Sequence, residues 1–380
     1  MEREKHSQAH LRRVMEKYPA CGDFVGADSY GSGHINDTYR VTANLAGTPI
    51  HYLLQRINHN IFTRPDRLME NIVRVTGHVH GKVSGAPDSS RRGLTVLMTR
   101  DGNPCARDEE GNWWRLYLFI EGARTYDMIE SELQAFEAAR AFARFQNQLA
   151  DLPAPRLHET IPAFHNTLSR LETLDAAVAA DAFGRRAEVA AELAFVMERR
   201  TQCGRLFERH ARGEIPERIT HNDTKINNVM LDDVTGEGIC VIDLDTVMPG
   251  FALYDFGDMM RSATAASRED ERDLSKVGCR ITMFEALARG YLAGADFLLP
   301  AEIEELVFSG RLITLTIGIR FLTDYLSGDV YFKTRRPGQN LDRCRMQFQM
   351  IRSMEAQAEA METIVRNITQ MRGRNFGEAN

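Results

Sequence analysis

The chain has 380 residues, of which 43% are hydrophobic and 26% are charged, and its formal net charge is −6. A chain of this length can bury a substantial core and is expected to form two lobes or domains. Its modest negative charge argues against a broad nucleic-acid-binding surface, so we expect no nucleic-acid partner.

The N-terminal segment, residues 1–18, is charged and helical in pattern, and it lacks the apolar core that a signal peptide needs. No apolar run looks long enough to span a bilayer, so we expect no membrane partner. The six cysteines are scattered, without the pair spacing of metal or redox sites. These features predict a reduced, cytoplasmic protein whose oligomeric state the sequence does not indicate.

Strand-like runs dominate the first third of the chain, because apolar residues there alternate with polar ones or cluster in short runs. The runs are residues 38–41, 50–54, 94–98 and 113–120. Between the second and third runs, Pro65 stands in the first turn of a predicted helix. The expected order is therefore strand, strand, helix, strand, strand.

Helical periodicity begins after residue 121. Ser131 and Gln134 fit a capping box that opens a helix running to about residue 150. Further helices are predicted near residues 185–212, 301–327 and 343–370. The pattern predicts an α+β fold with a small sheet-rich N-terminal lobe, residues 1–121, and a larger helical lobe, residues 122–380, joined by a hinge near 119–124.

The polar stretch THNDTKINNVMLD, residues 220–232, carries the strongest functional signal. Asp223 and Asn228 lie five residues apart in a predicted loop, and a hairpin follows whose second strand ends at Asp243. One carboxylate can accept or orient a hydroxyl proton, while an amide and a second carboxylate hold Mg²⁺ against phosphates. Asp and Asn are also common in turns, but the preceding His221 and the spacing to the hairpin favour phosphoryl transfer.

The motif resembles the H-x-D-x-x-x-x-N and I-D signature of the aminoglycoside phosphotransferase and choline kinase superfamily, which has a protein-kinase-like bilobal fold. The segment YDFGDMMR, residues 254–261, is similar to that family's acidic segment. The resemblance implies that Asp223 is the catalytic base and that Asn228 and Asp243 are magnesium ligands. It assigns scaffolding roles to His221 and Asp258.

The N-terminal third resembles the family's nucleotide site. Residues 31–41 are similar to the loop that covers the nucleotide, where Ser32 and Gly33 would let backbone N–H groups approach phosphate. The segment 118–122 resembles the hinge, so the backbone of Phe119 and Glu121 would hydrogen-bond the adenine of ATP.

The family's phosphate-pairing lysine has no counterpart in HYLLQRI, residues 51–57. Arg56 is the candidate cation, because arginine stays charged and grips phosphate bidentately, and Gln55 takes its place if the register slips by one. Glu70 would match the acidic partner of that cation or would lie on a solvated helix face.

Several blocks from about residue 32 to 332 together resemble the N-acetylhexosamine 1-kinase group of this superfamily. They are SGHINDTYRV, YLLQRIN, RLMENI, THNDTKINNVMLD, VIDLDTVMPG, YDFGDMMR and IRFLTDYLSGDVYF. The resemblance implies transfer of the γ-phosphoryl group of ATP to the anomeric hydroxyl of GlcNAc or GalNAc.

Candidate contacts to such a sugar, besides Asp223, lie in two places. Arg320 and Asp324, four residues apart in a predicted helix, offer one donor and one acceptor on a common face, or they form a structural ion pair. His34 would reach a sugar hydroxyl or face solvent, and Tyr325 would stack on a sugar or fill the core.

Two other functions stay open at this point. The first is a kinase of the same fold that acts on an aminoglycoside, a choline-like amino alcohol or another sugar. The second is a catalytically silent module that binds nucleotide or sugar, which the absence of the usual lysine leaves possible.

Overall fold

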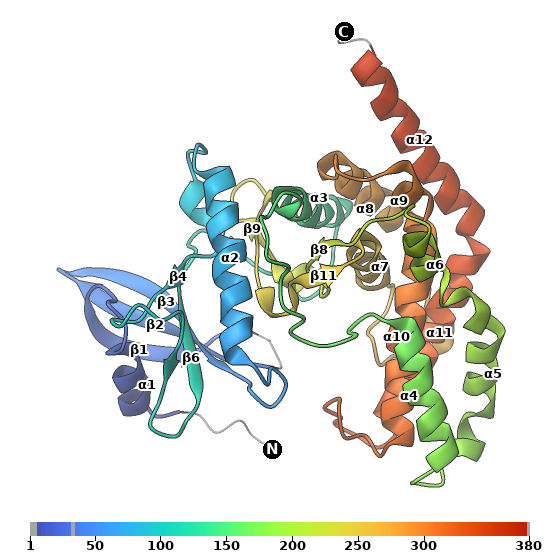
Figure 1. The fold of residues 1–380 in the computed structure, drawn as a ribbon, viewed down its shortest axis with the longest axis horizontal. Coiled ribbons are helices and arrows are strands. Elements are labelled where there is room, and N and C mark those ends of the chain that lie inside the picture. Colours follow the sequence, from blue (N-terminus) through green and yellow to red (C-terminus); the bar gives the residue numbers. More distant parts are fainter. Residues whose placement is uncertain (1–5, 32–34, 378–380) are drawn as a thin grey trace. The chain divides into compact units, whose positions relative to one another are not determined.

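The structure is a computed structural model that describes residues 6–31 and 35–377 (Figure 1). It divides into two compact units, each built from three segments of the chain. The first unit comprises Met1–Asp127, Asp151–Ile161 and Met230–Met248, and the second comprises Met128–Ala150, Pro162–Val229 and Pro249–Asn380. The chain therefore passes between the units several times.

The first unit is built on an antiparallel sheet with the order β1-β2-β3-β6-β4, and β5 pairs with β6. The strands are β1 (Asp23–Ser29), β2 (Asp37–Leu45), β3 (Thr48–Ile57), β4 (Val96–Leu97), β5 (Ala106–Arg107) and β6 (Trp113–Leu118). The predicted strands at 38–41, 50–54 and 113–120 are confirmed as β2, β3 and β6. The sequence prediction missed β1, whose sequence DFVGADS has few apolar residues to reveal its alternation.

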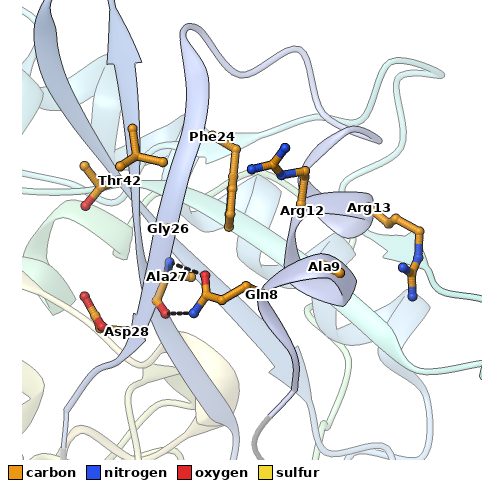
Figure 2. A pocket seen from close by; sticks show the side chains of 10 residues that line it. Gln8, Ala9, Arg12, Arg13, Phe24, Gly26, Ala27, Asp28 and Thr42 are labelled. Atoms are coloured by element: carbon orange, nitrogen blue, oxygen red, sulfur yellow. Dashed lines mark hydrogen bonds between the residues drawn. The ribbon is translucent and has the colours of Figure 1, made fainter.

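One face of this sheet carries the core of the unit. Leu54 of β3 and Trp114 of β6 are fully buried there with Leu11 and Val14 of α1 (Gln8–Met15). The side-chain amide of Gln8 forms two hydrogen bonds with the backbone of Ala27 (Figure 2). Its Nε2 donates to the Ala27 carbonyl oxygen at 2.7 Å, and its Oε1 accepts from the Ala27 N–H at 2.9 Å. These bonds fix α1 on β1.

A hollow lies between α1 and β1, and Figure 2 shows the side chains around it. Its lining includes Gln8, Arg12, Phe24 and Thr42, and among the residues that the structure describes it contains none that the sequence predicts for nucleotide, metal or acceptor.

The first unit also contains α2 (Pro65–Val83), the 3-10 turns Ser89–Arg91 and Leu244–Thr246, and a small second sheet. Helix α2 begins at Pro65, as predicted. The second sheet has the order β10-β9-β7, from β7 (Ala123–Arg124), β9 (Val229–Asp232) and β10 (Gly238–Val241). The predicted hairpin after residue 228 is confirmed.

The second unit is mainly helical. Its helices are α3 (Glu132–Leu149), α4 (Thr167–Ala180), α5 (Ala190–Arg199), α6 (Arg205–Ala211), α7 (Ala252–Ala263), α8 (Ile281–Gly294), α9 (Pro300–Glu304), α10 (Leu306–Leu326), α11 (Gln339–Ala356) and α12 (Ala358–Gly377). The short strands β8 (Arg218–Thr220) and β11 (Met248–Gly250) pair with each other. Helix α10 packs against α4, α7 and α11.

Local sequence signals explain how some of these helices begin and pack. Ser131 caps α3 as predicted, because its hydroxyl accepts a hydrogen bond of 3.2 Å from the N–H of Gln134. Helices α3 and α8 pack closely, since an added Cβ at Gly290 would lie 2.1 Å from the carbonyl oxygen of Phe136. The helix predicted at 185–212 is interrupted by 3-10 turns and becomes α5 and α6.

Helix α10 corrects the expectation that no apolar run is long enough to span a bilayer. Within residues 6–31 and 35–377 it alone passes that test by length and composition. Of its most apolar stretch, 83% is buried inside the protein, which is the property of a core helix. All six cysteines are free thiols.

Candidate active site

The loop between β8 and β9 brings Asp223 and Asn228 together, as the sequence predicts. The amide nitrogen of Asn228 donates to the carbonyl oxygen of Asp223 at 2.7 Å and to its Oδ2 at 3.0 Å. The other carboxylate oxygen, Oδ1, lies 2.8 Å from the Nζ of Lys225. The Asp223 side chain is 29% exposed, so it remains open to an incoming group.

Asp255 of helix α7 binds the backbone of this loop. The Asp255 carboxylate accepts hydrogen bonds from the N–H groups of His221, at 2.8 Å, and Asn222, at 2.7 Å, and from the amide of Gln146, at 2.7 Å. These bonds support the left-handed backbone of Asn222, with a φ of 66°. Burial raises the pKa of Asp255 to about 7, although the three donors oppose this.

A second aspartate of α7 supports the next residue of the loop. Oδ2 of Asp258 accepts a hydrogen bond of 3.0 Å from the N–H of Thr224, and its Oδ1 binds the guanidinium of Arg261. Asp258 thus has the scaffolding role that the sequence assigns to it. Asp255, which the sequence analysis missed, shares that role, and its only signal is its place in the acidic segment YDFGDMMR.

The electrostatics of the loop keep Asp223 ionised. Burial would raise the pKa of Asp223, but the Lys225 ammonium, His221 and the Asn228 amide lower it to about 2. The Asp223 carboxylate in turn raises the pKa of Lys225. At neutral pH the site therefore presents a carboxylate and an ammonium group side by side.

Lys225 is a functional candidate that the sequence analysis did not single out. It stands two residues after Asp223, and its side chain is 44% exposed. A charged residue inside the loop motif was the available signal. Its ammonium group can neutralise negative charge that approaches Asp223.

The predicted magnesium ligands, Asn228 and Asp243, would each offer a side-chain oxygen to the ion. Asn228 directs its amide nitrogen at Asp223, so its Oδ1 lies on the other side of the amide group. Asp243 is exposed, has a left-handed backbone with a φ of 58°, and begins the 3-10 turn Leu244–Thr246. Among the described residues no group of three His, Cys, Asp or Glu side chains could hold a metal ion. Carboxylate and amide oxygens suit a hard cation that keeps several waters, such as Mg²⁺.

The structure does not form the predicted pair of Arg56 and Glu70. Arg56 lies opposite Asp37 in the sheet and binds its carboxylate, with an Nε–Oδ2 distance of 2.7 Å. Glu70 accepts instead from His158, at 2.8 Å. The pairing fails because Arg56 lies on the same side of the sheet as its cross-strand neighbour Trp114, which belongs to the core.

Gln55, the alternative to Arg56, points to the opposite face of the sheet, since successive side chains of a strand alternate. Its cross-strand neighbour is Arg115 of β6, whose Nε donates to the Oε1 of Gln55 at 2.9 Å. Arg115 is fully buried and forms an ion pair with Asp245. The sequence analysis did not identify this arginine.

The predicted hinge follows β6. The N–H of Phe119 donates to the carbonyl of His51 at 3.3 Å, and the Glu121 carboxylate lies 2.6 Å from the Nδ1 of His51. Arg91 donates to the carbonyl oxygens of Glu121, at 3.0 Å, and Gly122, at 2.7 Å. Ser32, Gly33 and His34, the remaining candidates of the N-terminal third, lie outside the described residues, between β1 and β2.

Asp324 and Tyr325 are both engaged within the helical unit, and Tyr325 is buried in its core, which is one of the two predicted alternatives. The Asp324 carboxylate accepts hydrogen bonds from the backbone N–H groups of residues 330, 331 and 332, at 2.8–2.9 Å, and from the amide of Asn340, at 2.8 Å. Four donors use the hydrogen-bonding capacity of a carboxylate. The Tyr325 hydroxyl donates to Glu188 at 2.6 Å, and Arg185 covers its ring.

Arg320, by contrast, lies among aromatic rings. Its guanidinium carbon is 5.0 Å from the ring centre of Phe164, 5.6 Å from that of Tyr331 and 5.3 Å from that of Phe332. Its one side-chain hydrogen bond among the described residues is a long one of 3.4 Å to the Tyr331 hydroxyl. Burial lowers the pKa of Arg320. The expected ion pair with Asp324 is not formed.

A chain of contacts joins Arg320 to the loop that carries Asp223. The ring of Phe164 packs on that of His165 at 4.6 Å, and the Nε2 of His165 lies 2.7 Å from the carbonyl oxygen of Asn222, which precedes Asp223. Burial lowers the pKa of His165 to about 4, so the imidazole is neutral and its Nε2 donates. Arg320 and Asp223 also interact electrostatically.

Comparison with known proteins identifies the family and the fold. The sequence model of the phosphotransferase enzyme family matches residues 28–300. The chain is similar to the solved structure of the microcompartment-associated aminopropanol kinase, at 14% identity and a TM-score of 0.56, covering 94% of this chain and 99% of that one.

Two further solved structures resemble the chain. The aminoglycoside phosphotransferase from Alicyclobacillus acidocaldarius subsp. acidocaldarius matches at 13% identity and a TM-score of 0.57, covering 98% of this chain and 97% of that one. Spectinomycin phosphotransferase in complex with ADP and spectinomycin matches at 13% identity and a TM-score of 0.55, with coverages of 93% and 99%. These likenesses confirm the predicted protein-kinase-like α+β fold. Since the family match spans well over half of its length, the chain belongs to the phosphotransferase enzyme family.

Proposed function

We propose that the protein is an ATP-dependent kinase that phosphorylates the anomeric hydroxyl of an N-acetylhexosamine, GlcNAc or GalNAc, to give the sugar 1-phosphate. Family membership supports phosphoryl transfer, and the ADP complex of a structural relative is consistent with ATP as the donor. The sequence blocks described above support the choice of sugar.

The observation that carries this proposal is the positive charge of the surroundings of Arg320. A second arginine, Arg170, has its pKa lowered to about 10 by burial and by Arg320, and its Nε is buried without a hydrogen-bond partner among the described residues. Neither arginine has a carboxylate within ion-pair distance in the described part of the chain. Such a site repels an ammonium group, whereas the hydroxyl and amide oxygens of an N-acetylhexosamine can accept hydrogen bonds from it.

The aromatic rings around Arg320 also suit a sugar. Tyr331 is 57% exposed, and its ring packs edge-on against Phe332 at 4.8 Å. Exposed rings beside hydrogen-bond donors offer apolar contact to one face of a ring and polar contact to its hydroxyls. A cage for a quaternary ammonium group would need the rings without the guanidinium.

In the proposed reaction Asp223 accepts a hydrogen bond from the acceptor hydroxyl and orients it toward the γ-phosphorus. It takes the hydroxyl proton as the new P–O bond forms and the bond from the γ-phosphorus to the β,γ-bridging oxygen breaks, so that ADP leaves. Lys225 neutralises negative charge next to that carboxylate. Asn228 and Asp243 would hold Mg²⁺, which when bound supplies charge neutralisation at the phosphates. Asp255 and Asp258 keep the loop in the conformation that this chemistry needs.

The experiment that tests the function is coupled ADP release with MgATP and a panel of acceptors: GlcNAc, GalNAc, glucose, galactose, kanamycin and choline. Phosphorus NMR of the product identifies the phosphorylated position. We expect an anomeric phosphate from an N-acetylhexosamine and none from kanamycin or choline. If only kanamycin or choline is phosphorylated, the proposed acceptor is wrong. If no acceptor is phosphorylated, the chain is better explained as a binding module without catalysis.

The substrate class is tested separately with Arg320→Met. This variant should raise the KM for the sugar about tenfold or more, because a charged hydrogen bond is lost, while the KM for MgATP stays near the wild-type value. Arg352→Met is the matched control, since Arg352 also lies over an aromatic ring, that of Phe195, but is exposed and has no predicted role. An unchanged sugar KM in Arg320→Met would remove the support that this site gives to a neutral acceptor.

A further inference from the structure

A buried ion pair joins the sheet of the first unit to the turn that carries Asp243. Its members are Arg115 of β6 and Asp245, whose side chains are 1% and 4% exposed. Asp245 follows Asp243 by two residues and belongs to the 3-10 turn Leu244–Thr246. A single turn cannot fix its own position, so contacts of this kind decide where it lies.

Asp245 is held from several sides. Its Oδ1 binds Arg115, its Oδ2 accepts a hydrogen bond of 2.6 Å from the amide of Asn36, and its carbonyl oxygen accepts one of 2.7 Å from the hydroxyl of Thr160. Arg115 is oriented by Gln55, the neighbouring residue of β3. The turn is thereby tied to β3, to β6 and to the segment that precedes β2.

Asp243 lies two residues before this anchored carboxylate. Its backbone is left-handed, with φ and ψ of 58° and 57°, a conformation that is uncommon outside glycine but that Asp adopts more readily than most residues. Its side chain is exposed, whereas that of Asp245 is buried. Burial would lower the pKa of Arg115, but the charges of Asp245, Tyr117 and Asp243 raise it above its ordinary value, so the arginine also acts on Asp243 electrostatically.

We propose that Arg115 and Asp245 are the positioning pair of the nucleotide site, which holds Asp243 where binding of the magnesium nucleotide requires it. This inference rests on the proposed function. In protein kinases a lysine on the third strand and a glutamate on the following helix form the ion pair that must be in place for activity. Here the third strand presents Gln55 on the face of Arg115, and Glu70 of the following helix binds His158. The cation has moved to β6 and the acid to the turn after β10.

The test measures binding of ADP by calorimetry, with and without Mg²⁺, so that it needs neither an acceptor nor turnover. Arg115→Met and Asp245→Asn should each weaken Mg²⁺-dependent ADP binding at least tenfold and change the affinity for ADP without Mg²⁺ by less than threefold. Arg64→Met is the matched control, because Arg64 forms an exposed ion pair with Asp66 in the same unit. It should bind like the wild type.

The double variant Arg115→Met with Asp245→Leu separates positioning from stability. Replacing both members of a buried ion pair by apolar residues often restores stability that the loss of one member removes. We expect this variant to recover the wild-type melting temperature and still to bind MgADP weakly, whereas recovery of tight MgADP binding would overturn the inference.

Arg56→Met tests whether Arg115, as we propose, or Arg56, as the sequence suggests, is the cation of the nucleotide site. If Arg56→Met weakens MgADP binding and Arg115→Met does not, Arg56 is the cation of the site and the inference is wrong. Absence of MgADP binding by the wild-type chain would overturn the proposed function together with the inference. Wild-type binding that Arg115→Met and Asp245→Asn leave unchanged would overturn the inference alone.

Discussion

Replacement of Lys225 by methionine should move the acid limb of the pH–rate profile to higher pH. The Asp223 carboxylate titrates at about 2 instead of its ordinary 3.8, and Lys225 is the main cause of the lowering. Burial acts in the opposite direction, whereas His221 and Asn228 continue to lower the pKa, so removal of the ammonium group should return the pKa of Asp223 toward its ordinary value. The acid limb should therefore move upward by up to about two pH units.

The direction in which the acid limb moves depends on which protonation state of Asp223 is active. The carboxylate must be ionised to accept the hydroxyl proton, and in the wild type it stays ionised as the pH falls until the pH approaches 2. In Lys225→Met the neutral form appears at higher pH, so kcat/KM falls earlier on acidification. Turnover at neutral pH should also fall by about 100-fold, because a charge that stabilises the transition state is lost.

The assay is kcat/KM for the sugar at saturating MgATP between pH 2 and pH 9, with far-UV circular dichroism to establish the range in which each variant is folded. Lys225→Arg is the control, because it keeps the positive charge and should keep the limb near its wild-type position. Identical acid limbs in the wild type and Lys225→Met would refute the argument that Lys225 sets the ionisation of Asp223.

Three other variants test separate parts of the structure. Asp223→Asn should retain nucleotide binding, measured by calorimetry, and lose most turnover; turnover like that of the wild type would contradict its role as base. Asp255→Asn should lower the free energy of unfolding in urea by about 2 kcal/mol, since an amide cannot accept all the hydrogen bonds that hold the catalytic loop. Gly290→Ala should lower the melting temperature clearly, because its Cβ would overlap the backbone of α3, whereas Gly278→Ala, with its nearest neighbour at 3.6 Å, should melt like the wild type.

Features that depend on neighbouring residues could be predicted from the sequence. The start of α2 at Pro65, the cap of α3 at Ser131 and the hairpin after Asn228 follow from turn and capping signals that span a few residues. Asp223 and Asn228 were found for the same reason, because one short loop contains both of them.

Features that depend on distant strands could not be predicted in this way. The sequence does not reveal that β6 lies next to β3, so the juxtaposition of Gln55 and Arg115 was invisible. Arg56 was chosen because arginine stays charged, and the sequence does not show that its cross-strand neighbour Trp114 is in the core. The hydrogen bonds of Asp324 could not be predicted, because most of its partners belong to a loop that folds back after the helix ends.

That loop, residues 328–332, is shaped by one carboxylate and by backbone N–H groups, which nineteen of the twenty amino acids possess. The path of residues 330–332 therefore depends on Asp324 more than on the side chains that these residues display, whereas Gly328 and Asp329, with φ values of 92° and 62°, are less free to vary. Tyr331, which covers Arg320 from this loop, can be exchanged while the peptide frame around Asp324 stays intact. Substitutions at Tyr331, in nature or in a mutant library, can therefore change which acceptor is recognised without changing how the loop folds.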